Sequence, residues 1–281
     1  MLKIIVDASA DMPDGWADLY QLEILPIPIQ IGGRTYQQGV DITPDEFYDL
    51  IANGAGHPQT AAPSPHRIKT FVEKVSDFGD TVLSINVSGK MSSTVTMVKL
   101  AANELKEQIA LYPFDSLSGS AAIAFMAREA RLRERAGDTI EEILAKLKKM
   151  RDDVMIVLTL DSLEFAYRSG RVGALTALVT SLLKIKPIVS LQEGMLNVSE
   201  KVRTRKKSLE CLVGKIKEKY GSQPIKVAIV HSQDIDTAML LKEMVEGTLN
   251  SVETIFTDLS ISVAANLGPK TVGIVAVPDK I

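Results

Sequence analysis

Small hydroxyl side chains and backbone amides, rather than acid–base pairs, are the groups in this sequence best suited to contact a ligand. The stretch HPQTAAPSPHR, residues 57–67, holds three prolines together with Thr60 and Ser64. Proline lowers the entropy lost when a loop is fixed in one shape, and both hydroxyls can donate a hydrogen bond. We therefore predict a rigid loop that orients a ligand without attacking it.

A second candidate follows the apolar run TVLSINV, where Ser88 and Gly89 precede a predicted helix. Free backbone N–H groups at the start of a helix favour an anion, and a carboxylate fits that chemistry. The alternative is that Ser88 only caps the helix. Both interpretations stay open on these residues alone.

The motifs of common enzyme classes are missing. Gly89-Lys90 resembles part of a phosphate-binding loop, but Ser84 and Met91 stand where such a loop requires a glycine and a hydroxyl. There is no G-x-G-x-x-G and no G-x-S-x-G motif, so dinucleotide-dependent and α/β-hydrolase chemistry lack their usual signals. We predict no catalytic residue and no cofactor.

Metal and carboxylate chemistry is no better supported. The three histidines and the single cysteine are not spaced as metal ligands are; these residues are His57, His66, His231 and Cys211. Asp7 and Asp11 could form an acid–base pair, but carboxylates near strand ends more often cap a helix or face solvent. We therefore expect no metal site.

Composition and charge set the broad class of the protein. A chain of 281 residues with 46% hydrophobic residues can bury a large core and favours two domains. A net charge of −3 gives no positive field for nucleic acid or an anionic membrane. No apolar stretch approaches the roughly 20 residues that cross a bilayer, and no signal-peptide pattern opens the sequence. We expect a cytoplasmic monomer without a disulfide, without nucleic acid and without membrane insertion.

Short β-branched runs alternate with helical patterns, which indicates an α/β fold with mainly parallel strands. The strongest predicted strands are KIIVD, TVLSINVS, VMIVLTL, KPIVSL, IKVAIVHS and TVGIVAV. A helix is predicted over 43–54, with Thr43 as its cap, and another over 137–153. We place a domain boundary after this second helix, with an N-terminal α/β domain at 1–152 and a C-terminal α/β domain at 153–281.

An ordered series of short motifs then resembles the DegV family nearly end to end. The series is Asp7-x-Ser9-x-Asp11, Thr60-x-x-Pro63-Ser64, Ser88-Gly89, SGRV at 169–172, KPIVSLQEGML at 186–196, KVRTRKK at 201–207 and ANLGP at 265–269. The resemblance implies a two-domain α/β protein with a mainly parallel N-terminal sheet, which holds a palmitate-like long-chain fatty acid in a tunnel between the domains. It also implies a carrier that presents this lipid to a fatty acid kinase, and not an enzyme.

The resemblance assigns the carboxylate of the fatty acid to Thr60, Ser88, Gly89 and Asn266. The family usually has histidine in place of Asn266, and Lys90 and Met91 replace a threonine or serine followed by tyrosine. These differences leave the identity of the acid open. As possible neighbours of the head group we name Ser64, Lys90 and Asp7.

Two stretches with apolar residues on nearly every side, SGSAAIAFMA and GALTALVTSLL, are predicted helices that are buried or face a cavity. Ordinary core packing is the alternative for each residue in them. Candidates to line the tunnel around the lipid tail are Met91, Phe125, Met126, Phe165, Leu175 and Leu178.

Basic residues raise a separate possibility of partner contact, although such runs are most often solvated surface. Arginine suits bidentate contact with phosphate or carboxylate, and the resemblance places the SGR motif near the rim where a kinase would dock. Candidates for partner contact are Arg171, Arg168, Arg203 and Arg205. The competing hypothesis is a phosphoryl- or acyl-transfer enzyme acting on a small carboxylate or hydroxy substrate, with Lys90 or His231 as the reactive group.

Overall fold

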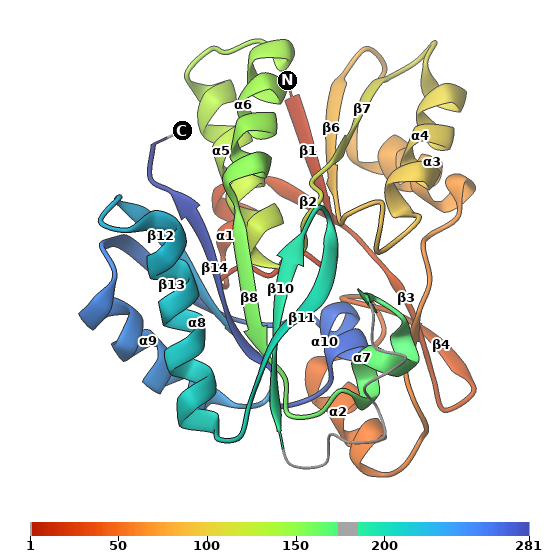
Figure 1. The fold of residues 1–281 in the computed structure, drawn as a ribbon. Helices are drawn as coiled ribbons and strands as arrows, with labels where there is room; N and C mark the ends of the chain where they lie inside the picture. Colours follow the sequence, from red (N-terminus) through yellow and green to blue (C-terminus); the bar gives the residue numbers. More distant parts are fainter. Residues whose placement is uncertain (1, 174–184, 281) are drawn as a thin grey trace.

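The computed structural model describes residues 2–173 and 185–280, and its first half is built on a parallel four-stranded sheet (Figure 1). The strand order is β2-β1-β6-β7. Neighbouring strands are all parallel, in the register Ile4↔Leu22 for β1 with β2 and Leu2↔Thr81 for β1 with β6. The bounds are β1 (Leu2–Asp7), β2 (Leu22–Leu25), β6 (Thr81–Asn86) and β7 (Ala110–Asp115).

Successive side chains of a strand point to opposite sides of this sheet, and helices bury both sides. Ile5 belongs to a core cluster with Ile68 of α3 and Val98 of α4, whereas Ile4 packs in the cluster that contains Phe125 of α5. Figure 1 shows α3 and α4 together beside β6 and β7. The helices are α1 (Trp16–Leu19), α3 (Pro65–Val75), α4 (Thr94–Leu105), α5 (Ala121–Arg135) and α6 (Ile140–Asp153).

The second half carries a seven-stranded sheet of order β13-β12-β14-β8-β10-β11-β9. This sheet is mixed, since β14 runs antiparallel to both β12 and β8, whereas β12 and β13 are parallel. The strands are β8 (Met155–Thr159), β9 (Val172–Gly173), β10 (Lys186–Gln192), β11 (Met195–Val202), β12 (Ile225–His231), β13 (Ser251–Asp258) and β14 (Val272–Pro278).

Helices on two sides enclose the seven-stranded sheet. One face packs on α8 and α9, and Val230 and Val275 of the other face share a core cluster with Ala127 of α5. Helix α5 is therefore a layer common to both sheets, and the core is continuous between the two halves. The helices of this half are α7 (Glu164–Ser169), α8 (Arg205–Tyr220), α9 (Ile235–Thr248) and α10 (Ile261–Leu267).

A small three-stranded sheet of order β4-β3-β5 joins the halves at the end where the cavity described below lies. Gly32 and Gly33 connect β3 and β4 with φ of 60° and 76°, which suits a two-residue hairpin turn. The Gly-Gly pair between apolar runs is a hairpin signal that our sequence analysis missed. The elements are β3 (Pro28–Ile31), β4 (Arg34–Gln37), β5 (Gln59–Thr60) and α2 (Pro44–Ala52).

The α/β class and the parallel N-terminal sheet are confirmed, as are the six predicted strands and the helix that begins after Thr43. The expectation of mainly parallel strands is wrong for the second sheet, where neighbouring strands such as β14 and β8 run in opposite directions. The change of sheet falls between α6, which ends at Asp153, and β8. We therefore propose a division into domains 1–152 and 153–281, because the chain passes from one sheet to the other at this boundary.

Candidate functional site

A cavity of about 300 Å³ lies between the two halves. Residues of the first half that line it include Thr60 and Val87, and residues of the second half include Leu158 and Asn266. Most of the wall is apolar. The apolar side chains are Ile27, Ala61, Ala62, Val87, Met91, Ile156, Leu158, Leu191, Leu196, Leu259, Val263 and Leu267.

Thr60 and Asn266 meet in this wall. Pairing of Thr60 with Ile29 in the small sheet fixes the threonine, and α10 carries the asparagine. Asn266 Nδ2 donates to the carbonyl of Ser262 at 2.7 Å and lies 3.4 Å from Thr60 Oγ1. Since Thr60 accepts in this contact, its own O–H stays available as a donor. The structure thus brings together two of the predicted carboxylate ligands.

Arg171 is the cation among the described residues that line the cavity. Its Nε lies 3.4 Å from the carbonyl oxygen of Met91, and its Nη1 donates to the carbonyl of Ser169. Ser169 in turn donates from Oγ to the carbonyl of Asn266 at 3.3 Å. This chain of contacts links the guanidinium to the part of the wall that holds Asn266.

Ser92 and Ser93 also line the cavity, and our sequence analysis did not name them. Ser93 is the N-cap of α4, but its side chain makes no capping hydrogen bond. The Ser93 hydroxyl is therefore left for another partner, and the start of α4 places the partial positive charge of a helix N-terminus beside the cavity wall, although the N–H of Thr94 already donates to Ser92 Oγ at 3.3 Å. The available signal was the Ser-Ser-Thr run that directly precedes the helical pattern.

Three other serines of the wall use their hydroxyls within the protein. Ser9 donates to Asp7, Ser120 donates to Asp11, and Ser262 donates to the carbonyl of Ala8. Two polar residues of the wall are also engaged, since the Ser92 hydroxyl lies 2.9 Å from Thr94 Oγ1 and the Asn266 amide donates to Ser262 and Thr60. At one end of the described wall they lie with three residues that keep a donor for a ligand, namely Thr60, Ser93 and Arg171. We call this set the polar end of the cavity.

Ser88 and Gly89 do not line the cavity; they hold a loop in place. Ser88 is buried, and its Oγ donates to the carbonyl of Gly194 at 2.6 Å. The N–H of Gly89 donates to Asp115 Oδ1 at 3.1 Å, and a Cβ at this glycine would lie 2.8 Å from that carboxylate. Ser88 joins the loop after β6 to the turn before β11, and Gly89 joins it to the end of β7, so the contribution of both residues to the site is indirect.

The possible head-group neighbours also lie outside the wall. Ser64 is exposed and caps α3 by accepting from Arg67 N at 3.3 Å, and Lys90 forms an exposed ion pair with Glu193 at 3.8 Å. Asp7 is buried and accepts from Val87 N at 2.6 Å. Burial raises the pKa of Asp7.

Of the predicted tail-lining residues, Met91 lies in the cavity wall. Phe125 and Met126 are buried in the shared core, where Phe125 packs edge-on against Trp16 at 6.2 Å between ring centroids. Phe165 packs against His57 at 5.1 Å and against Gly268. The apolar faces of these helices serve core packing, the alternative weighed in the sequence analysis. Leu175 and Leu178 lie outside the described residues.

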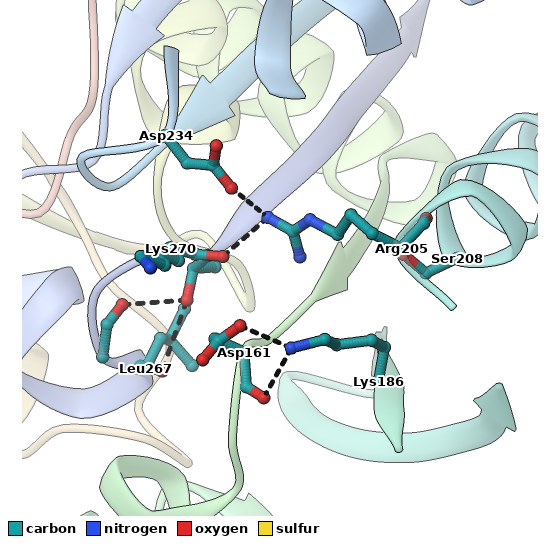
Figure 2. Close-up of polar contacts among 9 residues, drawn as sticks. Asp161, Lys186, Arg205, Ser208, Asp234, Leu267 and Lys270 are labelled. Atoms are coloured by element: carbon teal, nitrogen blue, oxygen red, sulfur yellow. Dashed lines mark hydrogen bonds and ion pairs between the residues drawn. The ribbon is translucent and has the colours of Figure 1, made fainter. Parts of the chain in front are cut away.

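The remaining arginines differ in exposure. Arg168 is exposed and pairs with Glu164 at 3.1 Å, and Arg203 is exposed. Arg205 is held within the protein, for its Nη2 donates to Asp234 at 2.6 Å and to the carbonyl of Lys270 at 2.7 Å (Figure 2). Figure 2 also shows the nearby pair of Lys186 with Asp161.

A buried carboxylate, Asp11, connects three segments around the cavity. It accepts from the Ser120 hydroxyl with one oxygen and from Ser260 N with the other, at 2.8 Å. Burial raises the pKa of Asp11 to about 6, and the charge of Asp258 adds to this shift. Ser120 has φ of 56° and ψ of −145°, which a serine rarely adopts, so this bond also fixes a strained backbone.

Two negative findings apply to residues 2–173 and 185–280. No cluster of three or more His, Cys, Asp or Glu side chains could hold a metal ion there. No helix in those ranges is long and apolar enough to span a membrane.

The fold and the site together define a two-part α/β protein with a ligand cavity between its halves. The chain belongs to the DegV family, since the family model described as "Uncharacterised protein, DegV family" matches residues 1–279. It is 30% identical to the fatty acid-binding protein of Thermotoga maritima over 281 residues, covering 97% of this chain and 96% of that relative.

Solved structures of the family agree with this fold. A DegV lipid-binding protein from Thermotoga maritima superimposes with a TM-score of 0.89 at 29% identity, covering 99% of each chain. A fatty acid-binding DegV family protein from Thermus thermophilus has the same TM-score at 27% identity, covering 99% of each chain.

Proposed function

We propose that the protein binds a long-chain fatty acid in the cavity, with its carboxylate at the polar end and its tail along the apolar wall. The observation that carries this proposal is the distribution of donors: the hydroxyls of Thr60 and Ser93 and the guanidinium of Arg171 gather at one end, while Ser9, Ser120 and Ser262 donate into the protein. An amphiphile with one anionic head matches this distribution. The fatty acid binding of the family members from Thermotoga and Thermus supports the same ligand class.

The tail supplies most of the affinity in this proposal. Burying about 14 methylenes at roughly 0.8 kcal/mol each contributes about 11 kcal/mol before the costs of association are subtracted. The head group then sets the direction of the lipid, and a few donors suffice for that. Arg171 and the start of α4 supply the positive charge that a carboxylate requires.

The role proposed here is that of a carrier rather than an enzyme. Lys90 is exposed and paired with Glu193, and His231 is buried outside the cavity wall, where its Nδ1 lies 3.2 Å from Asp258. Neither residue lines the cavity. In the finer form of the proposal, the protein works in the cytoplasm as a monomer and presents the carboxylate to a fatty acid kinase, with the exposed Arg168 and Arg203 in contact with that partner.

Mass spectrometry of the purified protein under native and denaturing conditions tests the carrier role. We expect added mass of a fatty acid in the native spectrum and its loss on denaturation. A covalent adduct that survives denaturation would instead indicate an enzyme intermediate. Failure of delipidated protein to take up added palmitate would contradict fatty acid binding itself.

A further inference from the structure

A second pocket, of about 400 Å³, lies at the other end of α5 from the fatty acid cavity. Ser120 at the start of α5 lines the first cavity, and Arg128 and Arg133 further along the helix line the second pocket. Eight residues of helix separate Ser120 from Arg128, which corresponds to about 12 Å. Figure 1 shows this end of α5 and α6 beside the C-terminal end of the chain.

The wall of this pocket is rich in cations, although the whole chain has a net charge of −3. Five lining residues are basic and two are acidic. They come from α5, α6, the start of β12 and the segment after β14, so the pocket forms only when the two halves pack together. The basic residues are Arg128, Arg133, Lys146, Lys226 and Lys280, and the acidic residues are Glu129 and Asp279.

The acidic groups are already engaged. Glu129 accepts from Arg133 Nε at 3.0 Å, and Asp279 pairs with Lys226 Nζ at 3.1 Å. Arg128 forms a two-bond ion pair with Glu253, at 2.6 and 2.9 Å, and is 8% exposed. These pairs hold the basic side chains in place around the recess and limit the entropy that a ligand would have to remove.

Lys146 of α6 stands among these cations. Burial lowers its pKa, and the charges of Arg133, Lys149 and Lys226 lower it further, with Glu129 acting in the opposite direction. The five basic side chains that converge on this recess from α5, α6, β12 and the C-terminal segment favour an anion there. Arginine and lysine together at a recess are the groups that bind phosphate oxygens.

We propose that this second pocket, which we call the α5–α6 pocket, binds the phosphate group of a small soluble anion. The ligand class is a phosphomonoester or inorganic phosphate. A phosphate seated there contacts Lys146 and Lys226, which approach from α6 and β12. Ligand binding at this position is separate from the fatty acid cavity and does not depend on what that cavity holds.

Isothermal titration with inorganic phosphate, at an ionic strength held constant with chloride, tests the proposal. We expect saturable binding to the wild-type protein and a loss of at least about tenfold in affinity for Lys146→Gln, since one charge-assisted hydrogen bond corresponds to about that factor. Lys148→Gln is the matched control, because Lys148 carries the same charge on the same helix but is exposed and outside the pocket wall. It should bind phosphate as the wild type does.

Three outcomes would overturn the proposal. They are no phosphate binding by the wild type, equal affinity in Lys146→Gln and the wild type, and an equal loss in Lys146→Gln and Lys148→Gln. Binding to phosphatidate-containing phosphatidylcholine vesicles without binding of inorganic phosphate would overturn the assignment to a soluble anion. Thermal melting confirms that each variant is folded, and retained fatty acid should match the wild type in both.

Discussion

The side-chain nitrogen Nδ2 of Asn266 lies 3.4 Å from Oγ1 of Thr60, and both residues line the same cavity although 206 positions separate them in the sequence. The pair combines an amide donor from α10 with a hydroxyl from β5. Neither group titrates near neutral pH. A histidine at position 266 would behave differently, because it would gain a proton as the pH falls.

The first prediction concerns the pH dependence of binding. Affinity for fatty acid should stay nearly constant from about pH 8 to 7, because Asn266 donates at any pH and the carboxylate of the ligand is ionised throughout. Asn266→His should bind more tightly as the pH falls from about 8 to 6, since the imidazolium attracts the carboxylate. Displacement of a fluorescent fatty acid measures both proteins. A steep dependence in the wild type would show that another group titrates at the site.

The second prediction separates residues in the cavity wall from those that hold a loop. Thr60→Ala and Ser93→Ala should each weaken fatty acid binding by about 1–3 kcal/mol, the range for a hydrogen bond to a charged group. Ser88→Ala should leave binding much closer to the wild type and lower the free energy of unfolding by about 1–3 kcal/mol, because the carbonyl of Gly194 loses its donor.

Lipid extraction and urea unfolding of the same three variants provide the measurements. Equal loss of lipid in Ser88→Ala and Thr60→Ala would return Ser88 to the head-group site, as our sequence analysis proposed. Full retention in both Thr60→Ala and Ser93→Ala would remove the polar end from the binding site.

The third prediction assigns different roles to two arginines. Arg171→Ala should reduce the retained fatty acid, because it removes a cation from the cavity wall. Arg168→Ala should retain the lipid, since Arg168 is exposed, but slow its phosphorylation by a fatty acid kinase at low salt, where surface charges speed association. Full lipid retention by Arg171→Ala together with slow phosphorylation would make Arg171 a partner contact instead.

The fourth prediction concerns Asp11. Its pKa is raised by burial from an ordinary value of 3.8 to about 6, so the folded protein binds the proton more tightly than the unfolded chain does. The stability this gives is present below about pH 4 and is lost as the pH rises through 6. Asp11→Asn has no such proton, so its free energy of unfolding relative to the wild type should rise by about 3 kcal/mol from pH 4 to 7.

Chemical denaturation of both proteins across this range measures the difference. The asparagine also loses one acceptor for Ser120 or Ser260, which lowers stability at every pH but does not change the slope. Parallel curves for the two proteins would show that Asp11 does not carry a raised pKa. Asp7 is common to both proteins, so its own titration cancels in the comparison.

Local patterns of residues are enough to predict the class of fold and much of the order of its elements. Runs such as KIIVD and IKVAIVHS are continuous and apolar because their strands are buried on both faces, and Thr43-Pro44 marks a helix start through local capping alone. These patterns depend only on residues close together in the sequence, so they can be read without the tertiary structure. The ordered motifs of the DegV family support the same fold.

Which polar groups face the cavity depends on long-range packing, which no local pattern reveals. Ser88 and Ser93 both lie near the start of α4, yet Ser88 donates to Gly194, more than a hundred residues away, while Ser93 lines the cavity. Phe125 and Leu158 are both buried in the shared core, but of the two it is Leu158 that also lines the fatty acid cavity. Periodicity reports that a side chain is buried, and only the packing of the two sheets on α5 determines whether protein or empty space lies against it.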